Sequence, residues 1–326
     1  MKDGYGREIT YLRISLTDRC NLRCIYCMPT NEPNFLPNNE LLTTNELTRV
    51  VRAAVDVGFN KIRLTGGEPA LRRDIVEIVD RLTHIDGMDE LVMTTNGYRL
   101  PVLAQKLAKA GLSRVNIHVD SLNGNTIDKT MRRAVVEQAW AGIEAAEKTG
   151  LNPIKLNAVV ARGFNETAVV ELARLSLQKP WQIRFIELMP FAGPTDITLN
   201  NYVSNDDVKA WIEAELGTLF AVNGGQLEGE ARIYRLAGSE GTLGFISPNS
   251  NPYCDDCNRM RLTADGRLRM CLLSEGEVDL RSTLRNGGTR GELVSLFEQA
   301  IRAKPKGHEL KNGLHPTDRT MSQIGG

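Results

Sequence analysis

The 326-residue sequence lacks several features that would define its class at once. No run of 18 apolar residues occurs, and the start, MKDGYGREITYLRI, has no apolar stretch of the kind a signal peptide needs. Basic and acidic residues balance at 40 each, so no charge excess favours nucleic acid or a membrane surface. We therefore expect a cytoplasmic protein that binds neither, with enough apolar residues (41%) for a large core.

Cysteine is absent from the whole middle of the chain, and the six cysteines form two groups of three. Cys20, Cys24 and Cys27 lie in TDRCNLRCIYCMP, whereas Cys254, Cys257 and Cys271 lie in YCDDCNRMRLTADGRLRMCL. Clustered cysteines in a reducing compartment bind metal more often than they form disulfides. Structural zinc needs four protein ligands, whereas three thiolates on a four-iron cluster leave one iron for a non-protein ligand. None of the four histidines is close in sequence to either group, so iron–sulfur clusters are favoured over a zinc knuckle with an unidentified fourth ligand.

The second group contains its own folding signal. Asp265 and Gly266 separate two strand-like runs, which predicts a β-hairpin. A turn centred on these two residues places Met260 opposite Cys271. The hairpin would thereby return the third cysteine to the neighbourhood of Cys254 and Cys257.

Strand and helix patterns alternate along the first part of the chain. The predicted strands cover residues 11–17, 61–66, 90–96, 114–120, 154–161 and 182–188. Between them lie helical patterns, such as the one that opens with the capping box of Thr43 and Glu46 and closes at Gly58, and those near 135–149 and 166–179. Six alternations predict an α/β fold with a parallel sheet, namely a partial, open (βα)6 barrel of the TIM type.

The pattern changes near residue 190, where MPFAGPTD carries two prolines and a glycine. We place a domain boundary there, with the barrel in residues 1–190 and a smaller cluster-binding unit in residues 191–326. A helix is expected near 204–216. This second unit would close the open side of the barrel.

Alternation along the strands predicts a polar barrel interior. With Leu12, Ile14 and Leu16 facing the helices, the inward side chains are Arg13, Ser15, Thr17, Arg63, Thr65, Thr94, Asn96, Asn116, His118, Asp120, Lys155 and Asn157. Buried cations need anionic partners, so an anionic ligand is the economical explanation, and a structural network with Asp120, Glu68 and Glu187 is the alternative. Arg184 and Met189 have opposite parity, so either a bulge intervenes or only one of them faces inward.

The combination of CxxxCxxC after the first strand, Tyr26 before the last cysteine, and GGEP after the second strand resembles the radical S-adenosylmethionine superfamily. The second cysteine group, the following Arg259 and Arg261, and the terminal IGG resemble one family within it, the GTP 3′,8-cyclases of molybdenum cofactor biosynthesis. This resemblance runs nearly end to end, through LRISLTDRC, IRLTGGEP, TTNG and IRFIELM to Gly326.

The resemblance implies an enzyme with two [4Fe-4S] clusters and S-adenosylmethionine, which converts GTP to 3′,8-cyclo-7,8-dihydro-GTP. A 5′-deoxyadenosyl radical generated at the first cluster would take hydrogen from the ribose, and the second cluster would hold the guanine. It also implies a reducing electron donor such as a flavodoxin or ferredoxin, and a downstream cyclic pyranopterin monophosphate synthase. A homodimer is compatible with the family, although the sequence itself leaves the oligomeric state open.

The resemblance also assigns residues to roles. The cluster ligands are the six cysteines, and the S-adenosylmethionine contacts are Tyr26, Gly66, Gly67, Glu68 and Met189. The GTP contacts are Arg13, Arg63, Thr94, Lys155, Arg184, Arg259, Met260 and Arg261, and the catalytic tail consists of Gly325 and Gly326 near Arg13. This sequence departs from the family at His118, where a serine usually contacts S-adenosylmethionine, and in a shorter stretch after Arg133. Because an imidazole can also donate or accept a hydrogen bond, we assign His118 to the cofactor contacts as well.

Two rival classes share some of these features. Another radical S-adenosylmethionine enzyme with an auxiliary cluster, such as a peptide maturase, generally has more than the three C-terminal cysteines seen here. If the protein were instead a non-catalytic metal-bound regulator or electron carrier, the GGEP motif would be a coincidence. Binding of S-adenosylmethionine separates that class from the enzymes.

Overall fold

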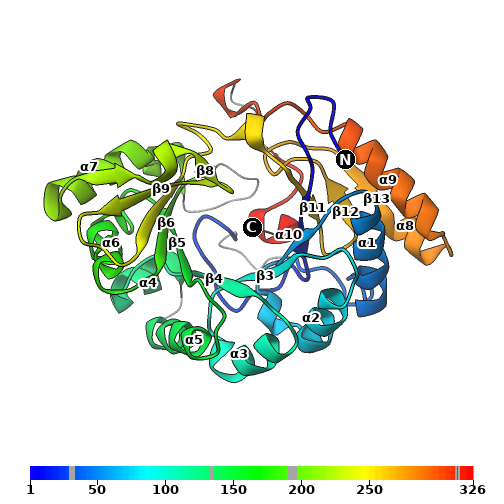
Figure 1. Ribbon diagram of the computed structural model, residues 1–326, viewed down its shortest axis with the longest axis horizontal. Helices are drawn as coiled ribbons and strands as arrows, with labels where there is room; N and C mark the ends of the chain where they lie inside the picture. The colour runs from blue at the N-terminus through cyan, green and yellow to red at the C-terminus, as the bar shows by residue number, and fades with distance from the viewer. Residues whose placement is uncertain (29–33, 133–134, 190–196, 313, 315, 326) are drawn as a thin grey trace.

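The computed structural model describes residues 1–28, 34–132, 135–189, 197–312, 314 and 316–325. Six parallel strands form the centre of the fold and curve around a common interior, with helices outside (Figure 1). They are β1 (Tyr11–Ser15), β2 (Lys61–Thr65), β3 (Glu90–Thr95), β4 (Arg114–His118), β5 (Lys155–Val160) and β6 (Gln182–Glu187). The predicted partial (βα)6 barrel is thus confirmed, strand by strand.

The barrel helices lie outside the sheet and cover its apolar face. They are α1 (Thr44–Asp56), α2 (Ile75–Thr83), α3 (Leu100–Lys109), α4 (Gly124–Met131), α5 (Val136–Lys148) and α6 (Val169–Gln178). Helix α1 begins at the predicted capping box, in which Thr43 and Glu46 exchange side-chain and backbone hydrogen bonds. Leu12 and Ile14 are fully buried in the core between sheet and helices, as the alternation predicted.

The C-terminal part of the chain extends the same sheet at both edges. Strand β10 (Thr242–Ile246) pairs in parallel with β6, and β11 (Arg259–Leu262) pairs in parallel with β1. The remaining strands are β7 (Leu219–Ala221), β8 (Leu227–Glu228), β9 (Ala231–Leu236), β12 (Arg267–Arg269) and β13 (Glu277–Asp279). The sheet runs from β13 at one edge to β7 at the other, so within the described residues the barrel remains open.

The register of the cysteine hairpin differs by one residue from the prediction. Arg261 pairs with Arg269 and Leu262 with Leu268, so Met260 aligns with Met270 rather than with Cys271. The turn has three residues, 264–266, and not the two we assumed, because Gly266 adopts a φ of +80° at its third position. The extra residue shifts every pair, and the strand β12 still brings Cys271 back toward Cys254 and Cys257.

In the described residues of the C-terminal part the α-helices are α7 (Asn205–Leu216), at the predicted place, α8 (Leu280–Arg285), α9 (Arg290–Arg302) and α10 (Met321–Ile324). Among the described residues, no helix has the length and apolar character to cross a lipid bilayer. The short α10 lies inside the ring of strands, at the centre of Figure 1.

The segment before α10 is fixed by buried ion pairs. Arg269, which is fully buried, pairs with Asp318 at 2.6 Å and with Glu277 at 2.8 Å. Arg319 pairs with Asp265 at 3.0 Å and with Glu277 at 2.7 Å. These contacts tie the C-terminal segment to the cysteine hairpin and direct α10 into the barrel.

Candidate active site

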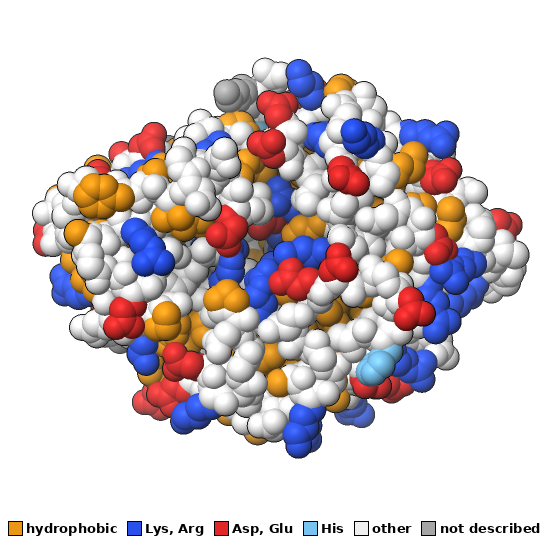
Figure 2. Space-filling model, viewed as in Figure 1, with side chains coloured by type: hydrophobic (Ala, Val, Ile, Leu, Met, Phe, Trp, Pro, Cys, Tyr) orange, Lys and Arg blue, Asp and Glu red, His pale blue; other side chains and the backbone are white. Residues whose placement is uncertain are grey.

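The barrel interior contains a cavity of about 210 Å³ toward the carboxyl ends of the strands, where parallel barrels place their active sites. Seen from this side, Lys and Arg side chains gather in a hollow at the centre of the molecule (Figure 2). The cavity is lined by residues from every barrel strand, by the first cysteine group, and by Glu230, Tyr253, Arg261, Leu272 and Met321 from the C-terminal part. Two segments far apart in sequence therefore build one site.

The predicted inward side chains lie largely as expected. Those that line the cavity are Arg13, Arg63, Thr65, Thr94, Asn96, Asn116, His118 and Asn157. Thr17 was predicted to face inward and instead borders a cleft on the outside, because β1 ends at Ser15 and the strand alternation stops there. Arg184 and Met189 both line the cavity despite their opposite parity, because β6 ends at Glu187.

The two glycines of GGEP hold the loop that carries the first cysteines. Gly67 donates a backbone hydrogen bond to the carbonyl of Thr17 at 2.6 Å, and Glu68 donates one to that of Arg19 at 2.8 Å. A Cβ atom on Gly66 or Gly67 would overlap these same carbonyl oxygens. Glycine is needed here because the two backbones are in direct contact.

Glu68 is buried and bridges two strand ends. Its carboxylate accepts hydrogen bonds from the backbone nitrogens of Ala70 and Asn96 at 3.0 and 2.7 Å, and from Thr95 Oγ1 at 2.7 Å. Burial nevertheless raises the pKa of Glu68. The carboxylate thus fixes the rim of the cavity between β2 and β3, next to Cys20 and Asn96.

Cys20, Cys24 and Cys27 all border this cavity. Burial raises the pKa of the Cys20 thiol to about 11 and that of Cys27 to about 12, and burial also raises the pKa of Cys24. The charges of the neighbouring cysteines also raise the pKa of Cys24 and Cys27, and all three side chains line the same cavity. Three close thiols in an apolar pocket suit a positively charged metal cluster, which would stabilise their thiolate forms.

Tyr26 and His118 form a polar cluster beside the first cysteines. The Tyr26 hydroxyl hydrogen-bonds to His118 Nε2 and donates to Asp120 Oδ2 at 2.6 Å. His118 Nε2 also lies 3.1 Å from Asp120 Oδ1. Burial opposes a charge on His118, yet the Asp120 carboxylate raises its pKa. The histidine at this unusual position therefore links Tyr26 and Asp120. The shorter stretch after Arg133 falls at residues 133–134, outside the described residues.

A second, smaller cavity lies next to the first and contains Cys254, Cys257 and Cys271. It shares Glu230, Tyr253, Arg261 and Leu272 with the barrel cavity, so one ligand could extend through both. Burial opposes the thiolate of Cys257, but the charges of Lys304 and Arg259 lower its pKa. His308 also lines this cavity, although it is far from the cysteines in sequence and was not predicted to lie there.

Each cysteine group offers three thiols to one cavity, a number that suits a four-iron cluster with one iron left for a non-protein ligand. Among the described residues, no group of three or more His, Cys, Asp and Glu side chains is spaced to hold one metal ion. A four-iron cluster spreads its thiolate ligands farther apart than one ion does. Three buried polar groups also face the cavities without a hydrogen-bond partner in the described part of the chain: Thr65 Oγ1, Asn157 Oδ1 and the terminal nitrogens of Arg259. These are the donor and acceptor positions that a bound molecule would satisfy.

The predicted cations are almost fully buried. Arg63, Arg184 and Arg261 line the barrel cavity and Arg259 and Arg261 line the second, whereas Lys155 belongs to neither lining. Arg63, Lys155, Arg184, Arg259 and Arg261 are each between 4% and 7% exposed. Burial lowers the pKa of Lys155 to about 8, that of Arg184 to about 10 and that of Arg261 to about 9, in each case with help from a neighbouring arginine. Such mutual repulsion favours an anionic ligand.

Contacts orient two of these cations. Arg63 donates to the Tyr11 hydroxyl through Nε and to Thr94 Oγ1 at 3.1 Å through Nη1. Arg184 Nε donates to Gln182 Oε1 at 2.6 Å. The guanidinium groups are therefore held in place from within the barrel.

The carboxylates that pair with the cations are not those of our alternative network. Glu68 accepts the hydrogen bonds described above. Asp120 accepts hydrogen bonds from Tyr26 and from the backbone nitrogen of Val159. Glu187 accepts backbone hydrogen bonds from Asn205, Asn249 and Ser250. The cations pair with two other glutamates. Glu230 lies 3.1 Å from Arg13 and 3.6 Å from Arg259, and Glu228 lies 2.8 Å from Lys155 and 4.0 Å from Arg184.

The C-terminal tail lies beside residues of the cavity. The carbonyl of Gly325 accepts a hydrogen bond from Arg261 Nη1 at 2.6 Å. Gly325 has a φ of +75°, and a Cβ atom there would lie 2.7 Å from Thr65 Oγ1. Gly326 lies outside the described residues.

Met260 is placed differently from our prediction of a substrate contact. Its side chain is buried in the hydrophobic core. Side chains alternate along β11, so Arg259 and Arg261 face the cavities and Met260 faces away from them. Our assignment of this residue followed its neighbours and ignored the pleat.

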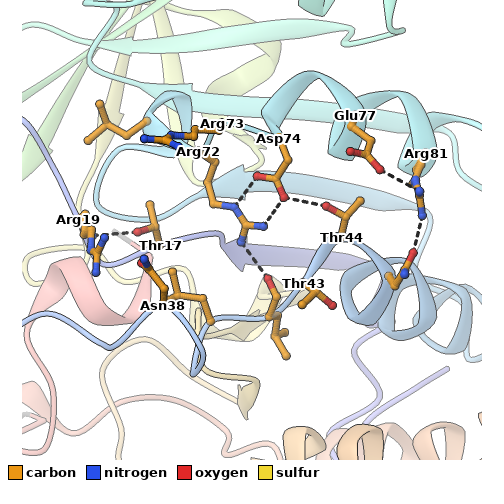
Figure 3. Close-up of a pocket in the computed structure, with 14 residues that line it drawn as sticks. Thr17, Arg19, Asn38, Thr43, Thr44, Arg72, Arg73, Asp74, Glu77 and Arg81 are labelled. Atoms are coloured by element: carbon orange, nitrogen blue, oxygen red, sulfur yellow. Dashed lines mark hydrogen bonds and ion pairs between the residues drawn. The ribbon is translucent and has the colours of Figure 1, made fainter.

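A larger cleft of about 680 Å³ lies outside the barrel, between the cysteine loop and α2 (Figure 3). Its charged groups largely satisfy one another. Arg72 pairs with Asp74 at 2.6 Å, Asp74 accepts from Thr44 at 2.8 Å, and Arg81 pairs with Glu77 at 2.8 Å. None of the six cysteines borders this cleft, which we interpret as structural.

Comparison with known proteins agrees with this geometry. Residues 14–176 match the model of the Radical SAM superfamily, and residues 181–310 match that of Molybdenum Cofactor Synthesis C. Crystal structures of SuiB from Streptococcus suis, with and without S-adenosylmethionine, share the fold at TM-scores of 0.58 and 0.59 with 13% identity. They cover 88% of this chain and 68% of SuiB. The fold and the cysteine loop thus define the class of radical S-adenosylmethionine enzymes.

Curated relatives narrow the class to one family. The GTP 3′,8-cyclase of Pelotomaculum thermopropionicum is 45% identical over 326 residues, and that of Moorella thermoacetica is 43% identical over 326 residues. Both alignments cover 100% of this chain and 100% of the relative. The chain belongs to the GTP 3′,8-cyclase family.

Proposed function

We propose that this enzyme converts GTP to 3′,8-cyclo-7,8-dihydro-GTP, the first step of molybdenum cofactor biosynthesis. One observation carries the proposal. The two cysteine groups border adjoining cavities that share Glu230, Tyr253, Arg261 and Leu272, and buried cations surround the junction. A nucleotide could therefore place its ribose near the first group while its base reaches the second.

The first cavity would hold a [4Fe-4S] cluster on Cys20, Cys24 and Cys27 together with S-adenosylmethionine. This pair, when bound, supplies a 5′-deoxyadenosyl radical that takes the hydrogen from the ribose 3′ carbon. Gly66 and Gly67 keep the cysteine loop against β2, and Glu68 fixes the rim of the site. Tyr26, His118 and Met189 line the space beside the cysteines and would position the cofactor.

The second cavity would hold a second [4Fe-4S] cluster on Cys254, Cys257 and Cys271, whose open iron would bind the guanine. Buried cations would then bind the phosphates, because arginine and lysine donate charge-assisted hydrogen bonds to phosphate oxygens. The residues we assign to this role are Arg13, Arg63, Lys155, Arg184, Arg259 and Arg261, with Thr94 supporting Arg63.

The tail would complete the site. Gly325 binds Arg261 through its carbonyl, and α10 covers one side of the cavity with Met321. We assign Arg13, Gly325 and Gly326 to the cyclisation step, in which they would orient the ribose and exclude water. Such exclusion protects a reactive radical from side reactions.

The chemistry also sets conditions outside the chain. The first cluster needs a reducing electron donor such as a flavodoxin or ferredoxin, and the product needs a cyclic pyranopterin monophosphate synthase to rearrange it. Six reduced thiols require a reducing compartment, so we propose a cytoplasmic location.

Anaerobic reconstitution with iron and sulfide tests the proposal. We expect about eight irons per chain, as two four-iron clusters require. After addition of reductant, S-adenosylmethionine and GTP, 5′-deoxyadenosine and the cyclised nucleotide should form together. A Cys24→Ser variant, which lacks one ligand of the first cluster, serves as the control and should form neither. About four irons, or 5′-deoxyadenosine with unaltered GTP, would contradict the proposal.

A further inference from the structure

A hairpin from the C-terminal part inserts two carboxylates among the cavity cations. Strands β8 and β9 are joined at Gly229 and Glu230, and Gly229 has a φ of +70°. The Glu228 side chain pairs with Lys155 and Arg184. The Glu230 side chain pairs with Arg13 and Arg259. The hairpin therefore supplies negative charge to the positions that our proposed function gives to the phosphates of the nucleotide.

Glu230 is the more deeply placed of the two carboxylates. Its side chain is 13% exposed, against 54% for Glu228, and it borders both cavities. Burial opposes its charge, yet Arg259, Arg13, Arg63 and Arg184 hold the pKa of Glu230 well below its usual range. It is therefore an ionised carboxylate within a cluster of arginines.

The contacts of Glu230 leave donors of Arg259 unused. Arg259 faces Glu230 with Nε at 3.6 Å, whereas its Nη1 and Nη2 atoms are buried without a hydrogen-bond partner in the described part of the chain. A single carboxylate thus balances part of the charge but does not saturate the hydrogen-bond donors. Phosphate oxygens, which are more numerous and carry more charge, would satisfy these donors better than Glu230 does.

The local geometry allows the Glu230 side chain to move away from the arginines that it pairs with. Strand β8 has two residues and pairs only with β9 within the described sheet, whereas Ala231 next to Glu230 is fully buried. Movement can thus be confined to residues 227–230, and a rotation of the Glu230 side chain alone would release Arg13 and Arg259.

We propose that Glu230 is a specificity-determining residue that acts as an internal competitor of the substrate phosphates. In the empty enzyme it holds the arginines in place, and a polyphosphate must displace it in order to bind. An uncharged ligand has no means to displace it and gains nothing when it is removed. The inference rests on the proposed function, since it assumes that the nucleotide binds in this cavity.

The test compares the wild-type holoenzyme with Glu230→Gln, which keeps the shape and removes the charge. GTP, inorganic triphosphate and guanosine are the ligands, and calorimetric titration under anaerobic conditions gives their dissociation constants. We expect Glu230→Gln to bind GTP and inorganic triphosphate at least about tenfold more tightly, since truncated ion pairs of this kind are worth at least that factor. Guanosine binding should stay unchanged. Glu240→Gln, an exposed change in the same part of the chain, should behave as the wild type.

Thermal unfolding gives an independent reading. Without nucleotide, Glu230→Gln should melt at a lower temperature than the wild type, because the arginines lose their counter-charge. Addition of GTP should raise the melting temperature of Glu230→Gln by more than it raises that of the wild type. If Glu230→Gln does not fold, Glu230→Asp keeps the charge but withdraws it from Arg13 and Arg259, and it should bind triphosphate more tightly than the wild type.

Other outcomes would overturn the inference. Equal triphosphate affinity in wild type and Glu230→Gln would show that the phosphates bind without displacing Glu230. Weaker binding of both GTP and guanosine would show that Glu230 contacts the base. If the wild-type holoenzyme bound neither GTP nor triphosphate, the proposed function itself would fail, and this result is seen before any variant is compared.

Discussion

Replacing Gly325 with alanine should separate radical formation from cyclisation. Gly325 has a φ of +75°, and an L-residue in this conformation costs about 1–2 kcal/mol. The added Cβ would also lie 2.7 Å from Thr65 Oγ1 and 3.0 Å from Ser15 Cβ, so the tail must shift or those groups must move. Together these costs should weaken docking of the tail by at least about 1.4 kcal/mol, which is a tenfold change in the docking equilibrium constant.

The assay measures two products of the reconstituted Gly325→Ala enzyme, cyclised nucleotide and 5′-deoxyadenosine. We expect the ratio of the first to the second to fall, by at most about tenfold for this loss in the docking equilibrium constant. The iron content should match that of the wild type, since Gly325 contacts Arg261 and not a cysteine. Gly238→Ala is the matched control, because Gly238 has a φ of +73° and a Cβ atom added there would have no other atom within 4 Å. An unchanged product ratio in Gly325→Ala would refute a catalytic role for the docked tail.

Three further changes test other parts of the site. Cys271→Ser should reduce the iron content by about half, as expected for loss of one of two four-iron clusters. It should abolish cyclisation while 5′-deoxyadenosine still forms. Loss of both products would contradict separate roles for the clusters. GTP affinity should fall between about pH 7 and pH 9, because burial lowers the pKa of Lys155 to about 8 and only its ammonium form attracts phosphate. Calorimetry in buffers of different ionisation enthalpy should detect proton uptake on GTP binding near pH 8. A pH-independent affinity would exclude a role for Lys155 in phosphate binding. His118→Ser removes one of the two partners of the Tyr26 hydroxyl and should weaken S-adenosylmethionine binding without loss of iron, and equal binding would make His118 a structural residue.

Local patterns in the sequence predicted what local interactions decide. Each barrel strand follows from a short run of alternating or apolar residues, and α1 begins at Thr43 because its side chain caps the helix. The two cysteine groups could be identified because their ligands lie within a few residues or one hairpin of each other. Gly66 and Gly67 were recognised by motif, and the contact of their backbone with Thr17 and Arg19 supplies the physical reason.

Long-range contacts were beyond such reasoning. Glu230 pairs with Arg13, which lies 217 residues earlier in the sequence. Strand β8, which precedes Glu230, is too short to give a strand pattern. His308 reaches the second cavity through a loop, so its distance in sequence from the cysteines was no guide. The one-residue error in the cysteine hairpin arose because a two-residue and a three-residue turn share the same Asp-Gly signal. Charged residues at the ends of short strands therefore merit attention wherever a predicted cavity has an excess of one charge.

The pairing of β1 with β11 has a consequence for the order in which the enzyme is built. Strand β1 leaves the ribosome early, but the neighbour that covers its outer edge is made of residues 259–262. During synthesis that edge stays unpaired until the cysteine hairpin emerges, and an unpaired edge invites wrong partners. The same hairpin brings Arg259 and Arg261, and Gly325, which bonds to Arg261, follows still later in the chain. A chain interrupted before Gly325 thus has the first cysteine loop without the residues that would enclose a radical, so the chemistry is contained only once the residues up to Gly325 have been made.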